Sequence, residues 1–190
     1  MNTIVRPAIV LFLLLTLVCG IIYPYAITGI GQLAFPSQTA GSLVTRDGVT
    51  IGSSLIGQSF TSPQYFWGRP SATGPMANNA SASSGSNQGP LNPALIDAVN
   101  GRIDALKAAD PGNTALIPVD LVTTSASGLD PEISVAAAYY QAGRIAGIRQ
   151  LPVETVRTLI DQHTQAQYFG FFGEARVNVL ELNLALDEIR

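Results

Sequence analysis

No charged side chain occurs between Arg6 and Arg46, and the first part of this run is apolar enough to cross a lipid bilayer. A helix over residues 8–30 would rise about 1.5 Å per residue to roughly 35 Å, which matches a hydrocarbon core of about 30 Å with some tilt. The sequence therefore predicts a short tail at 1–7, a transmembrane helix at 8–30 and one domain at 31–190 on one side of the membrane.

A cleaved secretory signal peptide is the alternative interpretation of this run. Such a signal has a basic start and an apolar centre of about 7–15 residues before a cleavage site of small residues. Arg6 gives only a thin basic start, and the apolar residues continue past Gly20 to Ile30. These features favour a retained anchor over a secreted or periplasmic binding module released by signal cleavage.

The charges that flank the apolar run predict its orientation. Arg6 precedes the run, whereas the first positive residue after it, Arg46, is offset by Asp47. The positive-inside rule then leaves the N-terminus in the cytoplasm and makes the domain extracytoplasmic. Thr16 and Gly20 are four residues apart, so they would let a second helix approach closely, although a simple lipid-facing helix fits as well.

The composition of the remainder indicates one folded domain rather than a disordered segment. The 190 residues leave room for the anchor and about 150 residues of domain, with enough Leu, Ile, Val and aromatic side chains to form a core. The net charge of −3 offers no basic patch for nucleic acid. We expect an α+β fold, with a single mixed helix and strand domain following the anchor.

The first half of the predicted domain combines a hairpin with a long loop. Residues 42–45 and 50–57 flank an Arg-Asp-Gly turn at 46–48, which predicts a short β-hairpin. An uncharged stretch at 70–96, rich in Ser, Asn, Gly, Ala and Pro, predicts a long loop.

The second half is predicted to be mostly helical, with one strand. Asn92 is a candidate N-cap for a helix that stops at Pro111-Gly112. The β-branched run 117–125 predicts a buried strand. Three further helices are expected: one after a cap at Asp130, one opened by Pro152, and one started by Asn178 together with Glu181.

The sequence lacks residues that several enzyme classes require. Lys107 is the only lysine and follows Leu106, so a Gly-Lys-Ser/Thr phosphate loop is excluded. His163 is the only histidine, so a metal cluster built from several histidines is excluded, and any serine triad would have to use this residue. It follows Ile160 and Leu159 by three and four residues, on or beside the apolar face of its predicted helix, which favours a packed or boundary histidine. An exported serine hydrolase that uses His163 remains the alternative hypothesis.

Strings along the whole chain resemble one family, the C subunit of the bacterial potassium-transporting Kdp ATPase. They are RPA at 6–8, YP at 23–24, GSSLIGQSF at 52–60, FWGRPSA at 66–72, GSN at 85–87, NPAL at 92–95, PVDLVTTSASGLDPEIS at 118–134 and VNVLELNLALD at 177–187. One departure is Ser84, where the family pattern leads us to expect a second glycine, and it affects only the conformation of that loop.

The resemblance implies a noncatalytic, single-pass accessory subunit of an inner-membrane complex for potassium transport. In that complex a channel-like subunit takes in potassium and a P-type subunit hydrolyses ATP, so ATP with Mg and potassium would be handled by these partners and no cofactor would bind here directly. The family is expected to stabilise the assembly and to act as a catalytic chaperone that raises the ATP affinity of the hydrolysing subunit. With only residues 1–6 in the cytoplasm, that effect would pass through the partners.

Candidate residues for subunit contacts in the domain are polar side chains, all but Arg144 inside the matching strings. They are Gln58, Arg69, Ser86, Asn87, Asp120, Asp130, Arg144 and Asn178. In the anchor the candidates are the two small residues Thr16 and Gly20, which lie outside these strings. Arg69 is the strongest candidate because it stands at the entrance to the uncharged loop, whereas Asp130 and Asn178 are also expected to cap helices and Asn87 to hold a turn.

Overall fold

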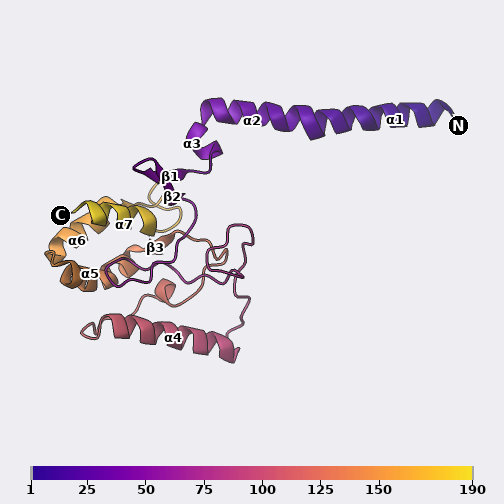
Figure 1. Cartoon of the computed structure of the whole chain (residues 1–190). Helices are drawn as coiled ribbons and strands as arrows, with labels where there is room; N and C mark the ends of the chain where they lie inside the picture. Colours follow the sequence, from indigo (N-terminus) through magenta and orange to yellow (C-terminus); the bar gives the residue numbers. More distant parts are fainter. Residues whose placement is uncertain (1, 190) are drawn as a thin grey trace. The chain divides into compact units, whose positions relative to one another are not determined.

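The computed structural model describes residues 2–189 and divides into two compact units, Met1–Leu43 and Val44–Arg190. The first unit is helical and the second combines helices with two small sheets, which confirms the α+β prediction (Figure 1).

The first unit is dominated by one continuous helix. It consists of α1 (Asn2–Leu17), a π-helical turn (Val18–Ile22) and α2 (Tyr23–Ala34), and a short α3 (Pro36–Thr39) follows. Among the described residues, Thr3–Ala34 is the one helix long and apolar enough to cross a membrane, and none of its most apolar window is buried within the protein. The helix extends beyond both ends of the span at 8–30.

The π-helical turn occurs next to Pro24. Pro24 has no amide hydrogen, so it cannot donate to the carbonyl four residues earlier, at Gly20. The neighbouring Tyr23 N–H instead donates to Val18 O, five residues back, which is the π-helical pattern. A Cβ added at Gly20 would meet nothing within 4 Å, so this side of the helix is open.

A β-hairpin opens the second unit, as predicted. Strand β1 (Leu43–Arg46) pairs with β2 (Val49–Ser53). The two turn residues, Asp47 and Gly48, have φ angles of 51° and 79°. Positive φ at both positions is typical of the type I′ turns whose twist matches a two-residue hairpin.

Residues 54–92 form no helix or strand, so the predicted loop is present and begins earlier in the chain than expected. It ends where α4 (Pro93–Ala109) begins. The Asn92 Oδ1 accepts a hydrogen bond from the Ala94 N–H at 3.0 Å, which confirms Asn92 as the N-cap. Leu106 is the buried residue of this helix.

The predicted strand at 117–125 is wrong, because the chain forms a 3₁₀ helix at Val119–Leu121 there. Pro118 cannot contribute an N–H to a ladder, and the carboxylate of Asp120 instead accepts two hydrogen bonds from Ser134. Leu121 is buried, as the β-branched run suggested, but on a helical turn.

A three-stranded antiparallel sheet was not expected. Its order is β3 (Glu132–Ser134), β5 (Arg176–Asn178) and β4 (Thr164–Gln165). Ile133 pairs with Val177, and both side chains are buried. Strands of two or three residues are too short to produce a recognisable alternation of apolar and polar residues.

Three helices cover the core of the second unit. They are α5 (Val135–Arg149), α6 (Val153–Gln162) and α7 (Val179–Glu188), and α6 contacts both α5 and α7 (Figure 1). Their completely buried side chains include Ile145, Ile160, Leu182 and Leu186.

The helix starts agree with the sequence in two of three cases. Pro152 stands just before α6, and the Asn178 Oδ1 accepts a hydrogen bond from the Glu181 N–H at 3.1 Å to cap α7. The predicted cap at Asp130 is wrong: α5 starts later, and the Ser134 Oγ accepts from the Ala137 N–H at 3.0 Å. Strand β3 occupies the residues between Asp130 and this helix.

Candidate functional site

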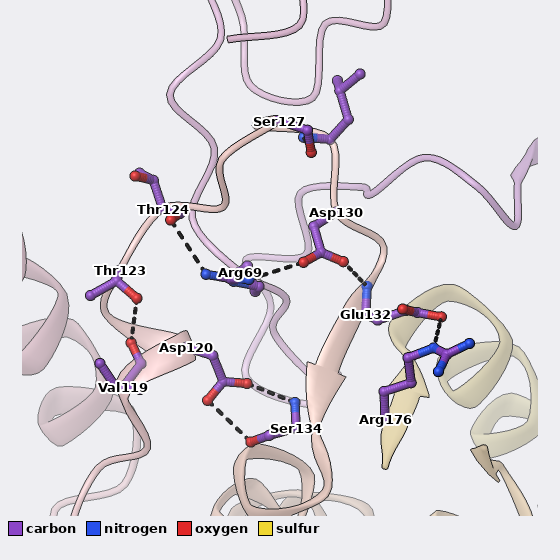
Figure 2. A network of polar contacts seen from close by, with 11 residues as sticks. Arg69, Val119, Asp120, Thr123, Thr124, Ser127, Asp130, Glu132, Ser134 and Arg176 are labelled. Carbon is purple, nitrogen blue, oxygen red and sulfur yellow. Dashed lines mark hydrogen bonds and ion pairs between the residues drawn. The ribbon is translucent and has the colours of Figure 1, made fainter. Parts of the chain in front are cut away.

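A cleft of about 610 Å³ brings together three of the predicted contact residues, Arg69, Asp120 and Asp130. It lies between the 3₁₀ turn, strand β3 and the segment that leads into β5, and Figure 2 shows its polar contacts. Two arginines and four carboxylates line it: Arg69, Arg176, Asp120, Asp130, Glu132 and Glu174. This cleft is the candidate functional site.

Arg69 is fixed from two sides in this cleft. Its Nη1 donates to the Asp130 Oδ2 at 3.0 Å, and its Nη2 donates to the Thr124 carbonyl at 3.3 Å. The side chains of Arg69 and Asp130 are 26% and 27% exposed, so the ion pair is partly shielded from water. The Arg69 Nε is buried and has no hydrogen-bond partner among the described residues.

The two aspartates organise the backbone around the cleft. The Asp130 Oδ1 accepts from the Glu132 N–H at 3.0 Å, which fixes the turn into β3. The Asp120 carboxylate accepts from the Ser134 N–H at 2.7 Å and from the Ser134 Oγ at 3.1 Å. Because Ser134 caps α5, Asp120 ties the 3₁₀ turn to the start of that helix (Figure 2).

A second ion pair crosses the sheet at the other side of the cleft. The Arg176 Nε donates to the Glu132 Oε1 at 2.8 Å, and the Arg176 Nη2 donates to the Tyr168 hydroxyl at 3.0 Å. These two hydrogen bonds raise the pKa of Arg176 above its usual value. Sequence reasoning missed this pair, since the two residues lie on separate strands and no spacing rule joins them.

The two aspartates of the cleft are fixed by contacts within the chain. Both oxygens of Asp120 and of Asp130 already accept hydrogen bonds from within the chain. Within residues 2–189, no group of three or more His, Cys, Asp or Glu side chains is placed to hold a metal ion. The arrangement suits a rigid polar surface that a partner could contact.

Arg144 lies away from this cleft and is buried. It donates to the carbonyls of Pro63 and Tyr65 and to the Gln141 Oε1, and its guanidinium lies 4.8 Å from the centre of the Trp67 ring. Desolvation lowers the pKa of Arg144 to about 10. Its contacts hold the long loop against α5, so the structure gives Arg144 a role inside the domain.

The remaining predicted residues are dispersed. The Gln58 Nε2 donates to the Ile51 carbonyl at 2.7 Å, and Gln58 shares with Arg69 a second cavity of about 270 Å³. Ser86 is half-buried, whereas Asn87 is exposed with a φ of 52°, the left-handed conformation of a turn. Asn178 is buried and also donates to the Ser54 carbonyl at 2.8 Å. Thr16 and Gly20 belong to the first unit.

His163 directly follows α6, and its Nδ1 lies 3.0 Å from the Leu159 carbonyl of that helix. The residue is half-buried, as expected for a packed or boundary histidine.

The backbone conformation at Ser84, the departure from the family pattern, does not require a glycine. Its φ is not positive, and its N–H donates to the Ser127 carbonyl at 3.0 Å. The steric demand falls on its neighbour Gly85, where an added Cβ would lie 2.9 Å from the Ala126 carbonyl oxygen.

Comparison with known proteins agrees with the resemblance seen in the sequence. The family model for the K+-transporting ATPase c chain, KdpC, matches residues 5–188. A potassium-transporting ATPase KdpC subunit of Janthinobacterium sp. (strain Marseille) is 73% identical over 188 residues, covering 99% of this chain and 100% of the relative. That of Herminiimonas arsenicoxydans is 72% identical, covering 99% of both chains. This chain, with one helix able to cross a membrane and a mixed helix and sheet domain, therefore belongs to the KdpC family of K+-transporting ATPase subunits.

Proposed function

We propose that the chain is a noncatalytic accessory subunit that stabilises a potassium-uptake ATPase in the inner membrane. The observation that carries the proposal is the family match at 5–188, because the match spans both the apolar helix and the domain. Arg6 supports a cytoplasmic N-terminus and an extracytoplasmic domain through the positive-inside rule.

The proposed partners are a channel-like subunit that binds potassium and a P-type subunit that hydrolyses ATP. In this proposal the partners bind ATP with Mg and potassium, and this chain holds no cofactor. The geometry of the cleft supports binding of these ligands by the partners, since the carboxylate oxygens of Asp120 and Asp130 already accept hydrogen bonds from within the domain.

The proposed effect on ATP affinity is indirect. With the domain on the extracytoplasmic side of the membrane, only the first few residues reach the cytoplasm, where ATP is bound. The chain would raise ATP affinity by favouring one conformation of its partners, and a differential contact energy of about 1.4 kcal/mol is enough for a tenfold change.

Two surfaces are proposed to make these contacts. In the domain, the cleft of Arg69 and Asp120 presents rigid polar groups to a partner. In the anchor, Gly20 lies in the π-helical turn and Thr16 lies two residues before it, and the open space beside Gly20 supports close approach of a partner helix.

Copurification from membranes tests the assembly. The full-length chain is expected to bring down two larger membrane subunits, and a variant without residues 1–30 is expected to lose them. Full-length chain that retains residues 1–30 but copurifies with neither subunit contradicts the proposal. Recovery of chains from which the apolar run has been cleaved supports the secreted-module alternative.

ATP kinetics of the purified complex test the effect on affinity. Removal of this chain is expected to raise the KM for ATP of the remaining subunits. Arg69→Ala is expected to raise that KM too, whereas Arg157→Ala, which removes an exposed arginine of α6, serves as the control and leaves it unchanged. Tight binding of ATP to the isolated full-length chain contradicts an indirect effect.

A further inference from the structure

Four aromatic side chains project from one turn between β4 and β5. Tyr168, Phe169, Phe171 and Phe172 are 62%, 88%, 69% and 57% exposed. No charged residue occurs between Asp161 and Glu174. We call residues 168–173 the aromatic tip. Large apolar side chains gathered in this way on a surface usually mark a place that another phase or molecule covers.

The backbone of the aromatic tip is held in place. The N–H of Tyr168 donates to the Phe172 carbonyl at 3.0 Å, and the N–H of Phe172 donates back at 2.9 Å. The Gln167 Nε2 closes the base of the turn on the Gly173 carbonyl at 2.9 Å. Phe169 has a φ of 54°, a left-handed conformation that is rare for a bulky residue, and its side chain is exposed.

Polar contacts occur at the base of the tip and not at its end. The Arg176 guanidinium lies 5.1 Å from the centre of the Tyr168 ring and donates to its hydroxyl. Glu132 in turn holds Arg176 through a 2.8 Å hydrogen bond. At the end, Phe171 and Phe172 contact each other with ring centres 4.2 Å apart. The turn is therefore polar where it joins the sheet and apolar where it meets its surroundings.

We propose that the aromatic tip inserts into the interfacial layer of the lipid bilayer that holds the chain's own helix. Aromatic rings favour the boundary between headgroups and acyl chains, and the tip carries no charge that would resist entry. A lipid surface fits better than a protein groove, since the side chains of Phe169, Phe171 and Phe172 have no hydrogen-bonding group to specify a docking partner. The inference rests on the proposed function only through the retained anchor.

The length of chain between the helix and the domain makes this contact attainable. Residues 35–43 separate the end of α2 from the second unit and extend to at most about 32 Å. A domain of this size has a radius of gyration of about 15 Å, so its surface stays within reach of the bilayer. Tethering at this length gives an effective concentration on the order of millimolar, and a shallow insertion of weak intrinsic affinity is then occupied.

A depth-sensitive fluorescent probe tests the insertion in the full chain. Two single-cysteine variants, Phe169→Cys and Phe171→Cys, are made in a Cys19→Ala background, and the probe is attached to the new cysteine of each. The control is Leu116→Cys, because Leu116 is apolar and 94% exposed but lies outside the tip. The chains are reconstituted into phosphatidylcholine vesicles in which part of the lipid is brominated near the headgroup.

Lipid-borne bromine is expected to quench both tip probes about twofold or more over the control probe, with aqueous iodide showing the reverse order. Equal quenching of the tip and control probes overturns the inference. Protection from iodide that appears only after the two partner subunits are added also overturns it and assigns the tip to a protein contact. Chains that fail to stay with the vesicles overturn the retained anchor instead, which sedimentation detects separately.

Discussion

Phe66 and Asn183 exchange two hydrogen bonds although 117 positions separate them in the chain. The Phe66 N–H donates to the Asn183 Oδ1 at 2.8 Å, and the Asn183 Nδ2 donates to the Phe66 carbonyl at 3.0 Å. A side-chain amide on α7 thus replaces the strand partner that the backbone of the long loop lacks. Both residues are buried, so no water competes for these groups.

The next residue repeats the arrangement on another helix. The Trp67 N–H donates to the Gln141 Oε1 at 2.8 Å, and the Gln141 Nε2 donates to the Trp67 carbonyl at 3.1 Å. Two consecutive residues of the loop are therefore fixed between α5 and α7. This attachment orients the following residues, among them Arg69 of the candidate cleft.

Asn183→Ala is expected to lower the free energy of unfolding by about 2–4 kcal/mol, because it leaves two buried backbone groups of Phe66 without partners. Urea unfolding of the full chain in detergent, followed by the fluorescence of Trp67, measures the change, and Trp67 is the only tryptophan. Asn100→Ala, on the exposed surface of α4, is the control. A loss no larger than that of the control contradicts the role assigned to Asn183.

A double-mutant cycle measures the ion pair between Arg69 and Asp130. Because the pair is partly shielded and the guanidinium also bonds the Thr124 carbonyl, we expect a coupling energy of about 1–2 kcal/mol. The control cycle uses Arg157 and Glu154, whose side chains are 50% and 73% exposed, and should give roughly 0.3–0.5 kcal/mol. Equal couplings in the two cycles would show that burial adds nothing to the first pair.

Gly128→Ala is expected to destabilise the domain by about 2 kcal/mol or more. Gly128 has a φ of 67°, and an added Cβ would lie 2.6 Å from the Ser84 carbonyl oxygen. Gly143→Ala is the matched control, since its Cβ would meet nothing within 4 Å and alanine favours the middle of α5 by about 0.5–1 kcal/mol. Thermal unfolding of both variants should shift in opposite directions, and a shift in the same direction contradicts the close approach at Gly128.

The hydrogen bond from the Tyr139 hydroxyl to the Asp161 carboxylate raises the pKa of Tyr139 above its usual value of 10.0. A raised folded-state pKa means that the stabilisation from this bond is complete below pH 10 and is lost as the pH rises through the raised pKa. The ultraviolet absorbance of tyrosinate in the wild-type chain minus that in Tyr139→Phe isolates this ionisation.

Asp161→Asn removes the negative charge next to Tyr139 and should move the midpoint of that titration down toward 10. Circular dichroism recorded at each pH verifies that the domain stays folded. A midpoint that is unchanged by Asp161→Asn would contradict the assignment of the shift to this hydrogen bond.

Features encoded within a few consecutive residues could be predicted from the sequence. The turn at Asp47-Gly48 needs positive φ angles, and the caps at Asn92 and Asn178 need a side-chain oxygen two or three residues before a free N–H. The apolar run that ends in α2 needs only its length and lack of charge. In each case the interacting atoms are neighbours in the chain, so local chemistry determines the outcome.

The failed predictions occur where a distant partner competes with a local preference. The run at 117–125 has the residues of a strand, but Asp120 bonds Ser134 and the chain turns instead. Asp130 has the position of a cap, but its carboxylate is occupied by Arg69 and by the turn into β3. Only the folded chain brings these partners together.

The sequence by itself predicted the long apolar helix, the mainly helical second half and the family, because length, periodicity and matching strings are properties of the linear chain. Tertiary structure decided which polar residues form the cleft and which hold the loop. Arg69 and Arg144 were both candidates for subunit contacts, yet Arg69 lines the cleft whereas Arg144 is buried against the Trp67 ring. The difference arises from long-range packing, which sets the desolvation and the hydrogen-bond partners of each side chain.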